Sequence, residues 1–179
     1  MSNPKLLLIT GSLREGSFNR MLVREAARMF GPADVTEADL NLPLYNGDVE
    51  TSEGVPEKAK TLAAQVAEAD ALIVGSPEYN KGITGVLKNA LDWASRVDMP
   101  AFKGKPTVLL SASAGRTGGE TALFMAQHCL SQFQVRFILG QGVMVAAASN
   151  HFDENGSLTT DTYRELLQTR MDELRAELG

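Results

Sequence analysis

Short apolar segments of strand-like pattern alternate with segments of helical pattern along the whole chain. Two strand-like segments, 71–76 and 107–113, are almost continuously apolar, which is typical of strands covered on both faces. In segments such as 23–30, apolar residues recur three and four positions apart, which indicates helices that bury one face. This alternation predicts an α/β fold with a parallel sheet and right-handed crossovers. The predicted strands are 5–10, 34–39, 71–76, 107–113 and 136–145.

Length, charge and cysteine content exclude several classes of protein. With 179 residues, the chain is long enough to bury a core that needs no disulfide or metal. Its net charge of -5 provides no basic surface for nucleic acid, and its first apolar run is too short for a signal peptide or a membrane span. Cys129 is the only cysteine, which fits a reducing compartment. We expect one domain over residues 1–179, in the cytoplasm, with no metal, nucleic-acid partner or membrane span.

The stretch from Gly11 to Asn19 follows the first predicted strand and leads into the first predicted helix. At such a junction, unpaired backbone N–H groups and the positive end of the helix dipole face the same point. Ser12, Ser17 and Asn19 can add neutral hydrogen-bond donors around a tetrahedral anion. Arg14 can add a full positive charge in bidentate form. The loop is therefore predicted to bind a phosphate group.

Two further loops follow the third and fourth predicted strands. Pro77 disfavours helical backbone at the residue before it, so the chain leaves the third strand in a stiff turn that can present backbone groups to a flat ring. Tyr79 and Asn80 on that turn are candidates to pack against such a ring and to hydrogen-bond near it. Ser113 and Gly115, after the fourth strand, belong to a run of small residues that lets a planar ligand approach the backbone. Because parallel strands end at one edge of the sheet, we expect the three loops to share a cleft.

The first loop carries the pattern G-S-x-R-x-x-S-x-N, and the loop after the third strand carries P-E-Y-N. In these loops the chain resembles the NAD(P)H-dependent FMN reductase family of flavodoxin-like proteins, which includes bacterial quinone and chromate reductases and related azoreductases. The resemblance spans almost the whole chain and implies a three-layer sandwich with a parallel sheet in the order 2-1-3-4-5. It implies that the FMN phosphate is bound by Ser12, Arg14, Ser17 and Asn19. It also implies that the isoalloxazine ring is bordered by Pro77, Glu78, Tyr79 and Asn80, with Ser113 and Gly115 near its pyrimidine side.

The same resemblance implies an enzyme that passes hydride from NADH or NADPH through FMN to a small-molecule acceptor by a ping-pong mechanism. The implied acceptor is a quinone or a similar compound, such as an azo compound, chromate or free flavin. No catalytic side chain is expected, because the cofactor carries the chemistry and the protein supplies orientation and electrostatics. The family also implies a homodimer or homotetramer with residues 84–95 near the interface. Glu120 and Thr121 stand where many relatives carry an arginine, so that arginine's role is not transferred.

Two other functions fit parts of the sequence. Ser113 ends a strand as the nucleophile of a serine hydrolase would, with His151 as base and Asp92 or Asp98 as acid. The first glycine of the nucleophile-elbow motif is missing, however. A flavodoxin-like electron carrier would bind FMN without NAD(P)H reductase activity of its own. Such a carrier is expected to have an uncharged phosphate loop, whereas this loop contains an arginine.

Four other charged or aromatic residues lie on or near these loops. Lys81 and Arg116 are candidates to meet a phosphate of the nicotinamide nucleotide. Glu78 is expected to matter through its backbone more than through its carboxylate. Trp93, in the helix that follows, is expected to lie in the core or at a subunit interface rather than to stack on the flavin.

Overall fold

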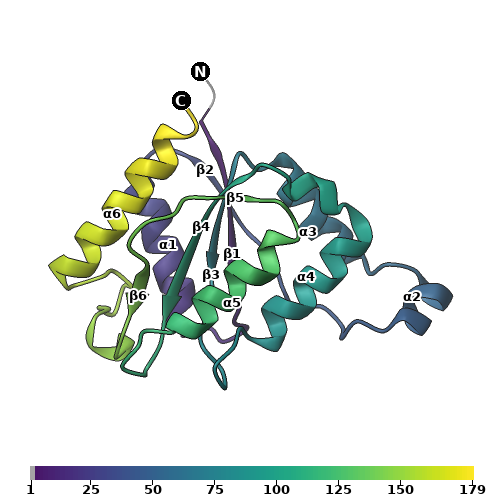
Figure 1. The fold of residues 1–179 in the computed structure, drawn as a ribbon, viewed down its shortest axis with the longest axis horizontal. Coiled ribbons are helices and arrows are strands. Elements are labelled where there is room, and N and C mark those ends of the chain that lie inside the picture. The colour runs from purple at the N-terminus through teal and green to yellow at the C-terminus, as the bar shows by residue number, and fades with distance from the viewer. Residues whose placement is uncertain (1–2) are drawn as a thin grey trace.

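One parallel sheet forms the centre of the computed structural model, which describes residues 3–179. Five strands follow the order β2-β1-β3-β4-β5, which confirms the predicted order, and β6 pairs with β4 next to β5. All of these strand pairs are parallel, so their carboxyl ends lie at one edge of the sheet (Figure 1). The strands are β1 (Lys5–Thr10), β2 (Asp34–Glu37), β3 (Ala71–Gly75), β4 (Pro106–Ala112), β5 (Arg136–Phe137) and β6 (Val143–Val145).

The prediction of one continuous strand over 136–145 was wrong. β5 pairs with the start of β4 and β6 pairs with its end, whereas residues 138–142 do not pair along β4 as a continuous strand. Gly140 in this segment has a φ of 155°, a conformation that residues with a side chain rarely adopt. The buried Arg170 donates a hydrogen bond to the carbonyl oxygen of Leu139 at 2.7 Å and holds the segment in place. The sheet therefore has a sixth strand that the sequence pattern did not separate.

Helices cover both faces of the sheet because alternate residues of each strand point to opposite sides. Leu7 and Ile9 of β1 pack with the helices of one face, α3, α4 and α5, whereas Leu6 and Leu8 pack with α1 and α6 on the other. Figure 1 shows this three-layer arrangement. The five long helices are α1 (Phe18–Phe30), which contains the predicted helical segment 23–30, α3 (Glu57–Glu68), α4 (Gly85–Val97), α5 (Glu120–Ser131) and α6 (Asp161–Ala176). There are also two short 3-10 helices, η1 (Met99–Phe102) and η2 (Ala148–Asn150).

A further helix, α2 (Gly47–Glu53), has no buried residue and stands off the side of the sandwich (Figure 1). It lacks the apolar period that would have predicted it, and it begins where the Asn46 side chain accepts a hydrogen bond from the backbone N–H of Asp48 at 2.9 Å. The segment before it is anchored by Trp93, which is buried and donates to the carbonyl oxygen of Pro43 at 2.8 Å. Trp93 is therefore a core residue. None of the helices described for residues 3–179 is long and apolar enough to cross a membrane.

Candidate functional site

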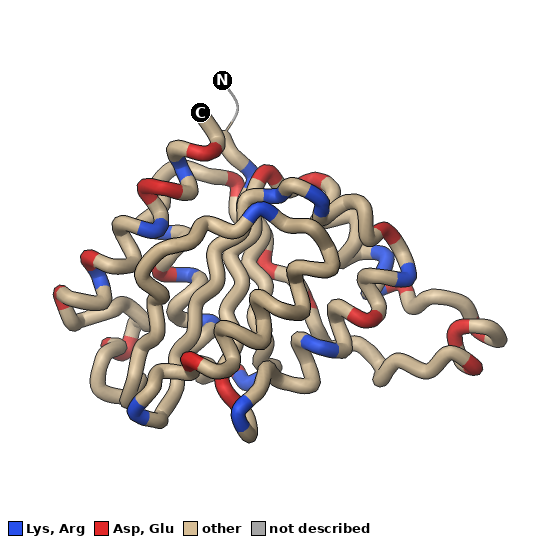
Figure 2. Tube along the Cα trace, viewed as in Figure 1, with Lys and Arg blue, Asp and Glu red and all other residues tan. Residues whose placement is uncertain are grey.

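The three loops at the carboxyl edge enclose one cleft of about 210 Å³. Eight residues singled out in the sequence line it, namely Ser12, Arg14, Ser17, Asn19, Pro77, Glu78, Tyr79 and Ser113. Asn80 and Gly115 belong to the same loops but do not line the cleft. Figure 2 shows residues of both charge signs on the loops at this edge. The sheet topology has thus brought together segments that are up to about a hundred residues apart, as expected for the edge of a doubly wound sheet.

Three residues of the lining were not identified from the sequence: Phe18, Ala112 and Ala114. Phe18 occupies an unspecified position of the first-loop pattern, and its ring stacks on Phe152 with centroids 5.7 Å apart. The two alanines carry no chemical group that could have marked them. Their contribution is the absence of bulk, which leaves the backbone after β4 accessible from the cleft.

The first loop is held between neighbouring strands and helices by its backbone. The N–H of Gly11 donates to the carbonyl oxygen of Gly75 at 2.8 Å, and the hydroxyl of Thr84 donates to the carbonyl oxygen of Gly11 at 2.7 Å. A Cβ atom at Gly11 would lie 3.0 Å from the Thr84 Oγ1 and 3.1 Å from the Ser76 Oγ, so a glycine is needed at this crossing. The loop is therefore braced against β3 and the start of α4.

Helix α1 begins at the cleft, and its first turn contains no acidic residue. Ser17 caps the helix, with its Oγ accepting a hydrogen bond from the N–H of Arg20 at 3.4 Å. Ser12 is buried, and its Oγ accepts from the N–H of Arg14 at 3.3 Å. The two predicted serine ligands thus also shape the loop, and the positive end of the helix dipole lies at the cleft with no carboxylate in its own first turn.

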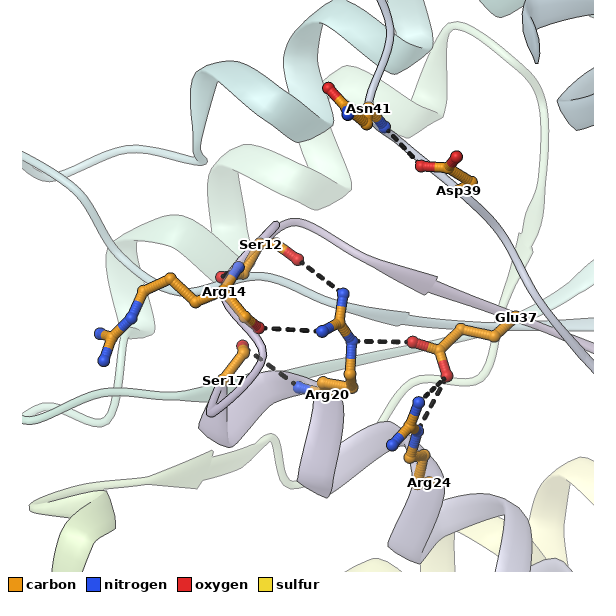
Figure 3. Close-up of polar contacts among 8 residues, drawn as sticks. All are labelled: Ser12, Arg14, Ser17, Arg20, Arg24, Glu37, Asp39 and Asn41. Carbon is orange, nitrogen blue, oxygen red and sulfur yellow. Dashed lines mark hydrogen bonds and ion pairs between the residues drawn. The ribbon is translucent and has the colours of Figure 1, made fainter.

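Arg14 has an exposed side chain at the cleft, whereas Ser12 and Ser17 are buried. Among the residues from 3 to 179, its guanidinium forms no hydrogen bond and no ion pair. In Figure 3 it extends away from the ion pairs formed by Arg20, Arg24 and Glu37. This positive charge is therefore available to an anion that enters the cleft.

Asn19 is almost completely buried, and its amide forms two hydrogen bonds with the last residue of β4. The Nδ2 donates to the carbonyl oxygen of Ala112 at 2.7 Å, and the Oδ1 accepts from the N–H of Ala112 at 2.9 Å. This paired geometry extends the hydrogen bonding of the sheet edge to helix α1. Asn19 thus connects the first loop to the third, and one N–H of its amide remains for a ligand.

The carboxylate of Glu78 connects the second loop to the third. It accepts hydrogen bonds from the backbone N–H groups of Thr121 at 3.0 Å and Ala122 at 3.4 Å, at the start of α5, and it lies 3.1 Å from the Lys81 Nζ. Burial raises the pKa of this carboxyl, but Lys81 and the two N–H groups lower it more, so the net pKa lies below the usual value for glutamate. Glu78 was expected to matter through its backbone more than through its carboxylate, but in the structure its carboxylate also caps a helix that begins more than forty residues later in the chain.

We expect Glu78→Gln to lower the free energy of unfolding by about 1 kcal/mol at pH 7, since the variant loses a charged helix cap. Because the folded-state pKa of Glu78 is lowered, its contribution is present above the ordinary glutamate pKa and is lost as the pH falls through the folded value. Urea unfolding at pH 7 and at successively lower pH measures this. The difference between wild type and variant should shrink with acidification, and a difference that stays constant would contradict the cap.

The tip of the second loop is a two-residue hairpin turn. Tyr79 and Gly82 exchange backbone hydrogen bonds of 3.0 and 3.1 Å, and the two residues between them, Asn80 and Lys81, have φ values of 51° and 65°. Tyr79 is 53% exposed, so most of its ring is free to contact a ligand at the cleft. Arg116, on the third loop, is exposed and lies outside the lining of the cleft.

The residues of the serine hydrolase alternative do not form a triad. The Nδ1 of His151 lies 2.7 Å from the Thr160 Oγ1, and the His151 ring packs on Tyr163. Ser113 instead accepts a hydrogen bond at its Oγ from the N–H of Gly115 at 3.1 Å. Asp92 pairs with Lys88 within α4, and Asp98 accepts a hydrogen bond from the N–H of Ala101 at 3.2 Å. Neither the candidate base nor either candidate acid is therefore bonded to the serine. Over residues 3–179, no three His, Cys, Asp or Glu side chains form a group that could hold a metal ion.

Comparisons with known proteins identify the family of the chain. Residues 4–150 match the NADPH-dependent FMN reductase family. The chain is 42% identical over 173 residues to an NAD(P)H-dependent FMN reductase of Pseudomonas aeruginosa, with 96% of this chain and 93% of the relative covered. It is 40% identical over 132 residues to a quinone reductase of Escherichia coli K12, covering 70% of each protein.

A solved structure extends the agreement from sequence to fold. The flavoenzyme NAD(P)H:(acceptor) oxidoreductase FerB of Paracoccus denitrificans superimposes with a TM-score of 0.84 at 25% identity, covering 98% of this chain and 97% of that one. Residues 4–150, which match the family, contain all three loops of the cleft. The chain therefore belongs to the NADPH-dependent FMN reductase family, the flavodoxin-like oxidoreductases that depend on FMN and NAD(P)H.

Proposed function

We propose that this protein uses bound FMN to transfer hydride from NADH or NADPH to a quinone. The observation that carries this proposal is the cleft itself, which is lined by the exposed cation of Arg14 and the start of α1 together with Pro77 and Tyr79. One end of the cleft is suited to a phosphate and the other to a flat ring. Relatives named as an FMN reductase and a quinone reductase support the same class of reaction.

The residues present fit the mononucleotide. Ser12, Arg14 and Ser17 would hold its phosphate together with the remaining amide N–H of Asn19. The ring would be bordered by Pro77, Glu78, Tyr79 and Asn80 and, at its pyrimidine side, by Ser113 and Gly115. When bound, FMN supplies the acceptance and release of hydride, and the protein supplies position. The hydrogen bonds of Asn19 and Glu78 connect the loops that line the cleft to one another.

The finer parts of the proposal concern substrates and assembly. We infer that the nicotinamide nucleotide and the acceptor occupy the same open side of the cleft in turn, which gives ping-pong kinetics. Azo compounds, chromate and free flavin are further candidate acceptors. We also propose a single cytoplasmic domain that assembles as a homodimer or homotetramer, with α4 near the interface, as family resemblance suggests.

Steady-state kinetics with purified protein test this function. With FMN and 1,4-benzoquinone added, we expect continuous oxidation of NADH or NADPH without any partner protein, and parallel lines in double-reciprocal plots at several quinone concentrations. Protein that quenches FMN fluorescence but oxidises neither nucleotide would instead support an electron carrier. Protein that leaves FMN fluorescence unchanged would contradict both functions.

A further inference from the structure

We propose that Arg20, anchored by Glu37, is a positioning residue that directs the backbone N–H groups of the first loop toward the phosphate of the flavin. Neither residue lines the cleft. The inference rests on the proposed function, because it assumes that the anion bound by this loop is the phosphate of FMN. Arg20 and Glu37 would support the loop from behind, whereas other residues would touch the ligand.

Arg20 contacts the loop from the side of β2 (Figure 3). Its Nη1 donates to the carbonyl oxygen of Arg14 at 2.9 Å, and its Nη2 donates to the carbonyl oxygen of Ser12 at 3.3 Å. The Nε lies 2.9 Å from the Oε1 of Glu37, at the end of β2. The side chains of Arg20 and Glu37 are only 23% and 27% exposed, so this arrangement is partly shielded from water.

The consequence for the loop follows from the geometry of the peptide group. In a trans peptide, the C=O and the N–H of the next residue point in opposite directions. When Arg20 holds the carbonyl oxygens of Ser12 and Arg14, the N–H groups of Leu13 and Glu15 are directed away from it. In the part of the chain that the structure describes, these two N–H groups donate to no other backbone or side-chain acceptor. Both residues are exposed, so these N–H groups are donors that an anion bound at the loop can use in place of water.

The contacts of Arg20 with the two carbonyl oxygens and with Glu37 require the shape of an arginine side chain. Its planar guanidinium presents several N–H donors in a rigid fork, so one side chain reaches two carbonyl oxygens and a carboxylate at once. A lysine would keep the charge but has one flexible ammonium group. Because the guanidinium of Arg20 is bound to Glu37 and to two carbonyl oxygens behind the loop, its main contribution is orientation of the loop, whereas Arg14 contributes the exposed charge.

Arg24 provides a matched control. It follows Arg20 by one helical turn and binds the same carboxylate, with its Nη2 2.7 Å from the Glu37 Oε2. It makes no hydrogen bond to the first loop in the described structure. Arg20→Met and Arg24→Met therefore each remove one positive charge from Glu37, but only Arg20→Met releases the carbonyl oxygens of the loop.

The experiment compares FMN with riboflavin, which lacks the phosphate, by titrating each flavin against the full-length protein and following fluorescence. In Arg20→Met we expect the Kd for FMN to rise about tenfold while the Kd for riboflavin changes less than about twofold. In Arg24→Met both Kd values should stay within about twofold of wild type. Arg20→Lys should resemble Arg20→Met, because the charge alone does not orient the loop.

The outcomes separate this inference from the proposed function. If wild-type protein binds no FMN, the proposed function fails. If wild type binds FMN and Arg20→Met keeps the wild-type ratio of the two Kd values, the positioning role is overturned. An equal loss of affinity for both flavins also overturns it, since general damage to the cleft would then explain the result. Should Arg20→Met not fold, Arg20→Lys and Glu37→Gln replace it. In each, the ratio of the Kd for FMN to the Kd for riboflavin should rise above the wild-type ratio, and an unchanged ratio in both overturns the positioning role.

Discussion

Replacing Arg14 with alanine is expected to weaken the binding of FMN about ten-fold to a hundred-fold. This loss corresponds to about 1.5 to 3 kcal/mol, the range for a hydrogen bond to a charged group. Arg14 forms no ion pair or hydrogen bond through its guanidinium within residues 3–179, so the substitution removes no folded-state contact of that group. The free energy of unfolding without flavin should therefore stay within about 0.5 kcal/mol of wild type.

Fluorescence titration with FMN measures this effect, and Arg116→Ala is its control. Arg116 is also an exposed arginine on a loop at the carboxyl edge, but it does not line the cleft. We expect Arg116→Ala to bind FMN within about threefold of wild type, because a change in net charge alone is screened by salt. A titration of Arg14→Ala that matches wild type would remove Arg14 from the phosphate site.

The second large effect is expected at Gly119, where α5 begins. Gly119 has a φ of 92°, and a Cβ atom there would lie 2.0 Å from the Oγ of Ser111. Ser111 is completely buried in β4, and its hydroxyl donates to the carbonyl oxygen of Ser76 at 2.8 Å, so it cannot move aside without losing a buried hydrogen bond. Gly119→Ala should lower the free energy of unfolding by about 3 kcal/mol, from left-handed strain and overpacking together.

Gly104→Ala separates the two causes. Gly104 has a φ of 73°, but no atom lies within 4 Å of a Cβ built there. Its substitution should therefore cost only the backbone strain, about 1 kcal/mol. Urea unfolding of both variants measures the difference, and equal losses would show that the contact with Ser111 is relieved at no cost. Ser111→Ala combined with Gly119→Ala should be less destabilising than the sum of the single changes, because the closest contact is then removed.

The residues that touch the cleft were largely identifiable from the sequence because they lie in short local patterns. The first loop contains Ser12, Arg14 and Ser17 within six residues, and all three line the cleft. The connections behind these residues were not identifiable. Arg20 was one of several arginines on a predicted helix, and nothing in its sequence neighbourhood indicated that it would bind the carbonyl oxygens of Ser12 and Arg14.

The amino-acid sequence by itself determined the alternation of strands and helices, because apolar residues repeat with the period of the element that buries them. It also determined which segments end at the edge of the sheet that carries the cleft, since that edge follows from strand direction. Tertiary structure alone decided that Asn19 pairs with Ala112 and that Glu78 caps α5, because each pairing depends on packing between segments far apart in the chain. It likewise decided where the last predicted strand divides into β5 and β6, since the segment between them is held by Arg170 of α6. Local propensity carries no information about such partners, whereas the packed sheet places them within hydrogen-bonding distance.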